Sequence, residues 1–190
     1  MNDQKYALFE IKTEDEKTVY LYCSDVESSE VKINNLVDNF YGIFGDTDHV
    51  SISVIACDTE NVSNMAFMFS GCSSLKDLKF SESFNTTKVT GMKFMFSGCS
   101  SLTELDLNNF DTTNVTDMSF MFLGCSELKK INFGQNFNTT NVTNMNNMFD
   151  WCSSFPEDLR NKLDNVEEVI KFFKEKTTKK DFLKYHSAIK

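Results

Sequence analysis

Six cysteines give this chain its most reactive side chains. Four of them, Cys72, Cys99, Cys125 and Cys152, recur every 26 or 27 residues, and no Cys-x-x-Cys pair occurs. A zinc site would need ligands from adjacent repeats, and no histidine recurs with them, so we expect no metal. In-register side chains would point in parallel, which disfavours disulfides. We interpret the four as small buried thiols.

Catalytic groups are scarce. The two histidines, His49 and His186, are the most plausible general bases, and neither lies in a serine, cysteine or carboxylate motif. Asp46 and Asp48 flank a predicted loop and could bind a cation, although we favour a solvated turn. The sequence therefore predicts a protein that is not an enzyme and has no cofactor.

Five Asn-x-Ser/Thr sequons could mark a glycosylated exterior, and they begin at Asn61, Asn85, Asn114, Asn138 and Asn141. We favour a structural interpretation, because Asn, Asp and Thr side chains at a corner can hydrogen-bond the backbone of a turn. Repetition of the corner would then copy the tripeptide.

The spacing of these residues reflects a repeat of 26 to 27 residues. Four units begin at Val62, Val89, Val115 and Val142 and follow the pattern V-x-x-M-x-x-M-F-x-G-C-S-x-L-x-x-L-x-F/L, then F-N/D-T-T. Because the methionines and phenylalanines occupy the same positions in every unit, we interpret them as core residues rather than as the lining of a ligand pocket. Ordering one unit costs about 1.5 kcal/mol per residue, more than its own core returns, so units must stack.

The two halves of a unit have different periods. The Val, Met and Met-Phe positions recur at intervals of three and four, which predicts a short helical or 3₁₀ turn. Gly71, Gly98 and Gly124 follow, where a helix end needs positive φ, and Trp151 replaces glycine in the fourth unit. The second half alternates, as in Leu105-Asp-Leu107, and predicts a strand with one buried face.

These patterns divide the chain into three parts. Residues 48–155 form the repeat array, because Ile52-Ser-Val54 and Cys57-Asp-Thr59 supply half a repeat before the first unit. Residues 1–47 predict an acidic ββα cap, with strands at 5–11 and 18–23 and a helix at about 30–41. Residues 156–190 predict a helical cap, with Pro156 starting a helix and Val166, Val169, Ile170, Phe173 and Phe182 giving two short amphipathic helices.

The charge distribution limits the classes of partner. Residues 1–60 hold 13 Asp/Glu and four Lys, a balance of −9 that equals the net charge of the whole chain. This balance argues against direct nucleic-acid binding and favours a basic protein partner. No apolar run is long enough to span a membrane. The start, Met-Asn-Asp-Gln-Lys, lacks an apolar signal region, which predicts a cytoplasmic protein, whereas an export signal upstream of Met1 would predict the cell surface.

The segment Asn114-Val-Thr-Asp-Met118-Ser-Phe-Met-Phe122-Leu-Gly-Cys125, preceded by Phe110-Asp-Thr-Thr113, resembles the BspA-like leucine-rich-repeat surface proteins of low-GC bacteria and mycoplasmas. The resemblance covers about residues 50–155. It implies a right-handed solenoid of parallel strands, an α/β fold, used for adhesion or protein binding. The sequence departs from the family by lacking an export signal.

Outward positions on the predicted strands are the candidate partner-binding residues. They form three rows: Lys76, Thr103 and Lys129; Asp77, Glu104 and Lys130; Lys79, Asp106 and Asn132. Opposite charges in neighbouring repeats could simply stabilise the sheet. We expect a protein-binding module that uses this face or the acidic cap. The alternatives are a cytosolic inhibitor or nucleic-acid mimic that binds a basic protein, and a structural spacer.

Overall fold

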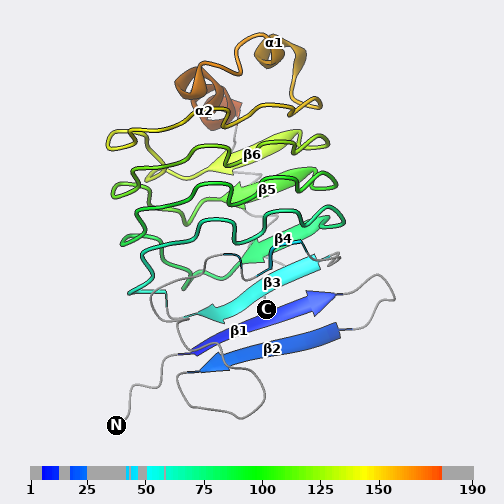
Figure 1. The fold of residues 1–190 in the computed structure, drawn as a ribbon, viewed down its shortest axis with the longest axis vertical. Helices are drawn as coiled ribbons and strands as arrows, with labels where there is room; N and C mark the ends of the chain where they lie inside the picture. Colours follow the sequence, from blue (N-terminus) through cyan, green and yellow to red (C-terminus); the bar gives the residue numbers. More distant parts are fainter. Residues whose placement is uncertain are drawn as a thin grey trace.

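The computed structural model describes residues 6–12, 18–24, 42, 44–46, 51–57 and 59–176. The strands among them are β1 (Tyr6–Lys12), β2 (Thr18–Ser24), β3 (Ser51–Cys57), β4 (Asp77–Phe80), β5 (Glu104–Leu107) and β6 (Lys130–Phe133). The helices are α1 (Glu157–Arg160) and α2 (Val166–Lys176). Figure 1 shows the strands at successive levels of an elongated molecule, with β2 near one end and the two helices at the other.

Strands β3 to β6 are corresponding parts of successive repeats. β3 pairs in parallel with β4, and β5 pairs in parallel with β6. In both pairs the register joins residues 26 apart, for example Ser51 to Asp77 and Glu104 to Lys130. Before them, β1 pairs antiparallel with both β2 and β3, so the two β-rich segments of the N-terminal region form the hairpin that their sequence predicts. The predicted helix at 30–41 lies outside the described residues.

The Met-Phe half of each repeat is a series of tight turns closed by hydrogen bonds over three residues, as in the predicted 3₁₀ turn, and it is not a continuous helix. Alternate amides bond to the next repeat: Met65 N–H donates to Gly91 O (2.9 Å) and Phe67 N–H to Lys93 O (3.0 Å). The intervening amides of Met68 and Ser70 bond back three residues instead. The physical reason is positive φ every fourth residue, at 60° for Phe67 and 76° for Gly71, which interrupts a helical path.

This turn ladder continues through the array. Phe94 N–H donates to Ser119 O (3.0 Å), and Phe120 N–H donates to Asn146 O (2.9 Å). Parallel bridges also join Asn64 to Gly91, Gly91 to Asp117 and Asp117 to Asn144. Successive repeats are therefore hydrogen-bonded in their turn halves throughout the array, and strand ladders join β3 to β4 and β5 to β6.

The repeated apolar residues form columns inside the array. Met95, Phe96 and Phe122 are completely buried, as their period predicts. The best-defined column is a stack of phenylalanine rings with centroids 5.2 to 5.6 Å apart and planes within 9° of parallel, comprising Phe44, Phe69, Phe96, Phe122 and Phe149. Apolar contacts thus run continuously from one repeat to the next.

The stacking begins before residue 48, the predicted start of the array. Gly42 N–H donates to Ala66 O (3.1 Å), Phe44 N–H to Met68 O (2.9 Å) and Asp46 N–H to Ser70 O (2.7 Å). Gly42 and Asp46 also have positive φ, as do Phe67 and Gly71. Gly42, Phe44 and Asp46 therefore take part in a partial turn half, so the stacking among the described residues extends to Gly42, before the predicted boundary at 48. The sequence obscured this segment because it lacks the methionines of the other copies.

Helices α1 and α2 cover the last repeat. α1 follows Pro156, where the sequence predicts a helix start. α2 buries Val166, Val169, Ile170 and Phe173. The Phe173 ring lies 5.1 Å from Phe155 and 6.3 Å from Phe133 between centroids, so this helix continues the aromatic core. The predicted contribution of Phe182 falls outside the described residues.

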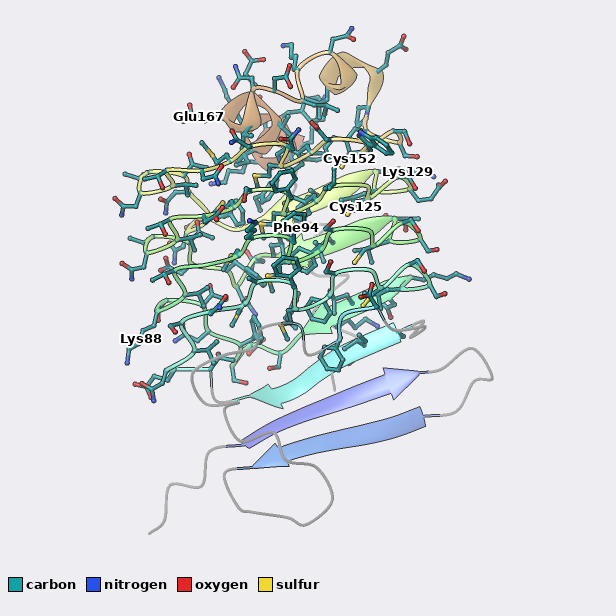
Figure 2. The ribbon with its side chains drawn as sticks, viewed as in Figure 1. Lys88, Phe94, Cys125, Lys129, Cys152 and Glu167 are labelled. Carbon is teal, nitrogen blue, oxygen red and sulfur yellow. The ribbon has the colours of Figure 1, made fainter. Side chains whose placement is uncertain are left out.

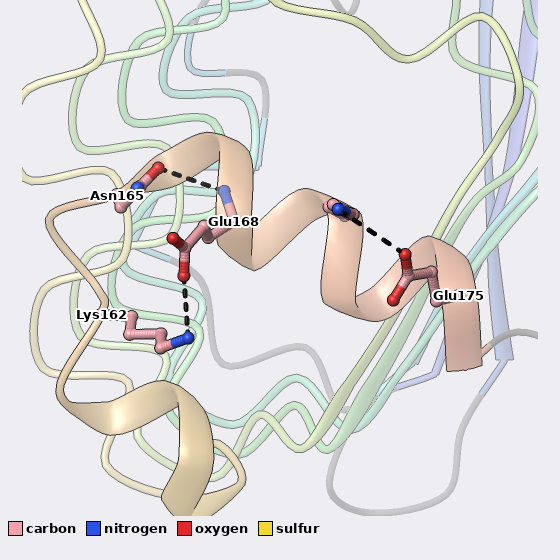
Figure 3. Close-up of polar contacts among 5 residues, drawn as sticks. Lys162, Asn165, Glu168 and Glu175 are labelled. Atoms are coloured by element: carbon pink, nitrogen blue, oxygen red, sulfur yellow. Dashed lines mark hydrogen bonds and ion pairs between the residues drawn. The ribbon is translucent and has the colours of Figure 1, made fainter.

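The start of α2 is fixed by local polar contacts. Asn165 Oδ1 accepts a hydrogen bond from Glu168 N–H (3.2 Å), which satisfies one of the free amides of the first turn. Lys162 Nζ lies 2.9 Å from Glu168 Oε2. Figure 3 shows both contacts at one end of α2 and the ion pair of Glu175 at the other.

Candidate functional site

The four repeated thiols are structural. Cys72, Cys99, Cys125 and Cys152 are fully buried and not in disulfides. Each Sγ–H donates to a phenylalanine carbonyl of the preceding repeat, for example Cys99 to Phe69 O at 3.2 Å. Burial raises the pKa of Cys99 and Cys125 well above the ordinary thiol value and that of Cys152 to about 12. These three thiols are therefore neutral at physiological pH. Figure 2 shows Cys125 and Cys152 inside the array.

The sequon residues support the corners of the repeats. Asn85 Oδ1 accepts from Thr87 N–H (2.8 Å), and Asn138 Oδ1 accepts from Thr140 N–H (3.2 Å). Two other sequon amides donate to the previous repeat, with Asn114 Nδ2 2.6 Å from Thr87 O and Asn141 Nδ2 2.7 Å from Thr113 O. Hydrogen bonding of the asparagine to backbone is thus confirmed for these four sequons, whereas Asn61 Oδ1 accepts from Lys88 Nζ (3.0 Å).

Buried threonines complete these corners. Thr59, Thr86 and Thr112 occupy one position in successive repeats and are at most 2% exposed. Thr112 Oγ1 donates to Asn138 O (2.6 Å) and accepts from Asn138 N–H (2.7 Å). The hydroxyl therefore acts as a bridge between two repeats. These hydrogen bonds between repeats account for the recurrence of Asn and Thr, so the recurrence does not require a ligand-binding role.

The remaining chemical candidates are largely outside the described residues. His49, His186 and Asp48 fall there. Asp46 is described, and its side chain occupies the space beside Gly71 where a Cβ would lie 2.0 Å from Asp46 Oδ1. Within the described part of the chain, no group of three or more His, Cys, Asp or Glu side chains could hold a metal ion.

Most of the predicted partner-binding residues lie on the surface. The exposed ones are Lys76, Asp77, Thr103, Glu104 and Lys129, and the half-buried ones are Lys79, Asp106 and Lys130. Lys79 Nζ pairs with Asp77 Oδ2 at 3.0 Å within β4, rather than across repeats. Figure 2 shows Lys129 and Lys88 on opposite sides of the array. The structure thus brings the first two rows together as one polar surface, which we call the strand face.

Asn132 is the exception, and its predicted outward position is wrong. Its side chain is only 3% exposed, and its Nδ2 donates to Asp106 Oδ1 at 2.8 Å. The reason is that α2 packs beside β6 and shelters the end of this last row. Asn132 is therefore not accessible from solvent in the way that Lys129 is.

A half-exposed aromatic column on the turn side was not predicted. Phe67, Phe94 and Phe120 are half-buried and stack with centroids 4.8 and 4.5 Å apart. Lys93 Nζ lies 5.3 Å above the Phe94 ring. The signal was present, because a Phe precedes the Met-Phe pair in three units. The helical interpretation concealed it by assigning these positions no special conformation.

Trp151 is a second exposed aromatic feature. It is 80% exposed and has φ of 65°, in the position that glycine occupies in the other three units. The ring therefore stands in solvent at the last repeat.

Two cavities flank Lys174 on α2. One, of about 440 Å³, lies between α2 and residues 137–140. The other, of about 530 Å³, lies at the end of β6. Lys174 Nζ donates to Phe137 O (2.6 Å), and burial lowers the pKa of this ammonium. No helix among the described residues is long and apolar enough to cross a membrane.

Comparison with known proteins identifies one family. The family described as Mycoplasma protein of unknown function, DUF285, matches residues 38–161 and again residues 103–186. The first match begins close to Gly42, where the stacking begins, and the two matches overlap within the repeats. No curated protein and no solved structure match the chain.

Proposed function

This chain belongs to the family described as Mycoplasma protein of unknown function, DUF285, and we propose that it is a non-catalytic protein-binding module. The observation that carries this proposal is the strand face. Three successive repeats place polar side chains there at matching positions, whereas the repeated thiols, methionines and phenylalanines are mostly buried. The repeated thiols are thus buried away from solvent, and the strand face presents polar side chains to solvent.

The repeat type is part of the same proposal. We assign the array to the BspA-like leucine-rich repeats and its architecture to a solenoid of parallel strands. The parallel pairing of β3 with β4 and of β5 with β6 supports this assignment, as does the continuous turn ladder. Solenoids present one side chain per repeat at a fixed spacing, which suits recognition of an extended protein surface.

Lysine dominates the exposed first row of the strand face. Lys76 and Lys129 lie in repeats one and three, with Thr103 between them, and all three are exposed. With Asp77, Glu104 and Lys130 in the second row, the strand face carries charges of both signs, which favours a partner segment with a complementary pattern of charges. Such contacts weaken as salt screens them.

A pair of matched double variants tests this proposal. Lys76→Glu with Lys129→Glu reverses two charges on the strand face, and Lys88→Glu with Lys171→Glu makes the same charge change elsewhere. Capture from extracts, quantified protein by protein, should show a partner whose recovery falls about tenfold with the first variant, equivalent to 1.4 kcal/mol. The second variant should leave that recovery within twofold.

Circular dichroism of both variants checks that they fold. Raising the salt concentration should release the same partner from the native chain. Equal recovery of every protein by both variants would contradict binding through the strand face. It would favour the alternative of a structural spacer joined through its ends.

A further inference from the structure

A threonine hydroxyl joins each corner of the array to the corner of the next repeat. Thr86 Oγ1 donates to Asp111 O and accepts from Asp111 N–H, both at 2.8 Å. One repeat later, Thr112 Oγ1 makes the same two bonds with Asn138, at 2.6 and 2.7 Å. The corner threonine therefore binds the C=O and the N–H of one residue, and that residue is Asp or Asn in both cases.

Thr139 occupies the same position in the last repeat, and no described residue follows it in the column. Its counterparts Thr59, Thr86 and Thr112 are at most 2% exposed, whereas Thr139 is half-exposed. Within the described part of the chain, the Thr139 hydroxyl forms no hydrogen bond, and it is not buried. Thr139 thus presents to solvent the donor and the acceptor that bind backbone in the preceding corners.

This threonine lines a groove of about 440 Å³ between the last corner and α2. Lys174 Nζ donates to Phe137 O (2.6 Å), a bond that joins α2 to the corner. The charged residues of the α2 wall are Glu167, Lys171, Lys174 and Glu175, whose formal charges cancel. A water molecule occupies only about 30 Å³. The groove therefore has room for more than a water molecule and has no net charge to attract an ion.

We propose that this groove binds a peptide segment of a partner protein, with the backbone of one Asn or Asp residue on Thr139. The preceding corners supply the template for this segment. Asn85 Oδ1 accepts from Thr87 N–H (2.8 Å) and Asp111 Oδ1 accepts from Thr113 N–H (2.9 Å), so the residue at this position begins a turn closed by its own side chain. A bound Phe-Asn-Thr-Thr segment would continue the column by one step. The groove is separate from the strand face, and this inference goes beyond the binding proposed there.

Nuclear magnetic resonance on the full, ¹⁵N-labelled chain tests the groove with a synthetic peptide. The probe copies residues 133–142, Phe-Gly-Gln-Asn-Phe-Asn-Thr-Thr-Asn-Val, and is blocked at both ends. It should shift the amides of residues 138–140 and 170–175 saturably, with Kd of about 1 mM or below. A second peptide carries an N-methyl group on the Asn that precedes Thr-Thr. It lacks the N–H that donates to the hydroxyl and should bind about fivefold more weakly.

Two adjacent threonines provide matched variants. Thr139→Val keeps the shape of the side chain and removes the hydroxyl, so it should weaken binding of the first peptide about tenfold. Thr140→Val makes the same change at an exposed position and should leave Kd within twofold. Both variants should fold, because neither position is in the core. Lys76→Glu with Lys129→Glu should also leave peptide binding unchanged, which separates failure of this site from failure of the strand face.

Three results would overturn the proposal. The first is the absence of saturable shifts at residues 138–140 with the unmethylated peptide. The second is equal affinity of the two peptides for the native chain, or equal affinity of the first peptide for the native chain and for Thr139→Val. The third is a concentration-dependent shift of the same amides without peptide, together with dimers in analytical ultracentrifugation, which would assign the groove to a second copy of the chain.

Discussion

Phe94 and Phe96 are two positions apart in the same unit and have different surroundings. The Phe96 ring is fully buried and stacks between Phe69 and Phe122, at 5.6 and 5.5 Å. Phe94 is half-buried, has φ of 57° and stacks on the outside of the turns. The periodic position of a residue in the turn half therefore decides whether its side chain stabilises the core.

Replacing the inner ring should be far more destabilising than replacing the outer one. Phe96→Ala removes contacts on both sides in a site that cannot collapse, so unfolding free energy should fall by about 3 to 5 kcal/mol. Phe94→Ala should lower it by about 1 kcal/mol, because solvent already reaches that ring. Urea denaturation measures both. A loss below 1 kcal/mol for Phe96→Ala would show that the wrong face has been assigned to the core.

The buried thiols make stability depend on alkaline pH. Burial raises the pKa of Cys152 to about 12 in the folded chain, whereas an unfolded cysteine ionises near 8.5. The folded state then holds a proton that the unfolded state has released, so stability falls as pH rises from about 8.5 towards 12, at up to ~1.4 kcal/mol per pH unit. Cys152→Ala should reduce this slope between pH 9 and 11. An unchanged slope in denaturation curves would exclude a contribution from this thiol.

The sequence predicts the buried residues well and the outer aromatic column poorly. Val, Met, Phe and Cys positions share one phase, and phase alone is enough to place Met95 and Cys99 in the core. It cannot reveal that Phe67 and Phe94 have positive φ, because phenylalanine rarely adopts that conformation. Nor does it show that Asn132 is buried, since that depends on α2, forty residues later in the chain.

The turn half is the element on which the array depends. Its amides alternate between bonds to the next repeat and bonds within the turn, and residues with positive φ make the alternation possible. Glycine adopts this conformation easily at 71, 98 and 124, whereas Trp151 does so at φ of 65°. The last repeat is therefore more strained at this position than the other three.

Exchanging residues in this column should change stability in opposite directions. Trp151→Gly relieves the left-handed conformation and loses little packing because the ring is 80% exposed, so unfolding free energy should rise by about 1 kcal/mol. Gly98→Ala, at φ of 74°, should lower it by about 1 to 2 kcal/mol. Thermal unfolding measures both variants. Stabilisation by Gly98→Ala would contradict the turn geometry.

The cap on α2 gives a prediction limited to one element. Asn165→Ala removes the acceptor of Glu168 N–H and should destabilise α2 by about 0.5 to 2 kcal/mol. Hydrogen exchange should accelerate in α2 and remain slow in the turn ladder of repeats two and three. Asn161→Ala, an exposed change outside the helix, is the control. Equal acceleration throughout the chain would show that α2 is not a separable cap.

Elements with strong periodicity are the ones that the sequence locates. β4, β5 and β6 occur where alternation predicts strands, and α2 buries four of the predicted apolar residues. The sequence left the turn half open between a helical and a 3₁₀ turn, because buried positions at intervals of three and four arise equally from a helix and from tight turns with positive φ. The array boundary was placed too late because Gly42 and Phe44 carry the backbone geometry of the repeat with a different sequence.

At the scale of the whole molecule, the array is built from stacked copies of one repeat rather than around a single globular core. The turn ladder and a continuous column of rings connect each copy to its neighbours, and strand ladders add to them between β3 and β4 and between β5 and β6. Such an array should tolerate loss of a whole copy, because the new neighbours present the same surfaces to each other. It should not tolerate loss of half a copy.

Deletion of one complete repeat tests this stacking most directly. Removing residues 89–114 joins Lys88 to Val115 in register, and removing residues 89–101 joins Lys88 to Leu102 and leaves a strand half without its turns. Urea denaturation of the 26-residue deletion should remain one cooperative transition, with a slope reduced by about one-seventh, in proportion to the surface lost. The 13-residue deletion should show no cooperative transition. If the two deletions unfold alike, the repeats do not stack in register and the account is wrong.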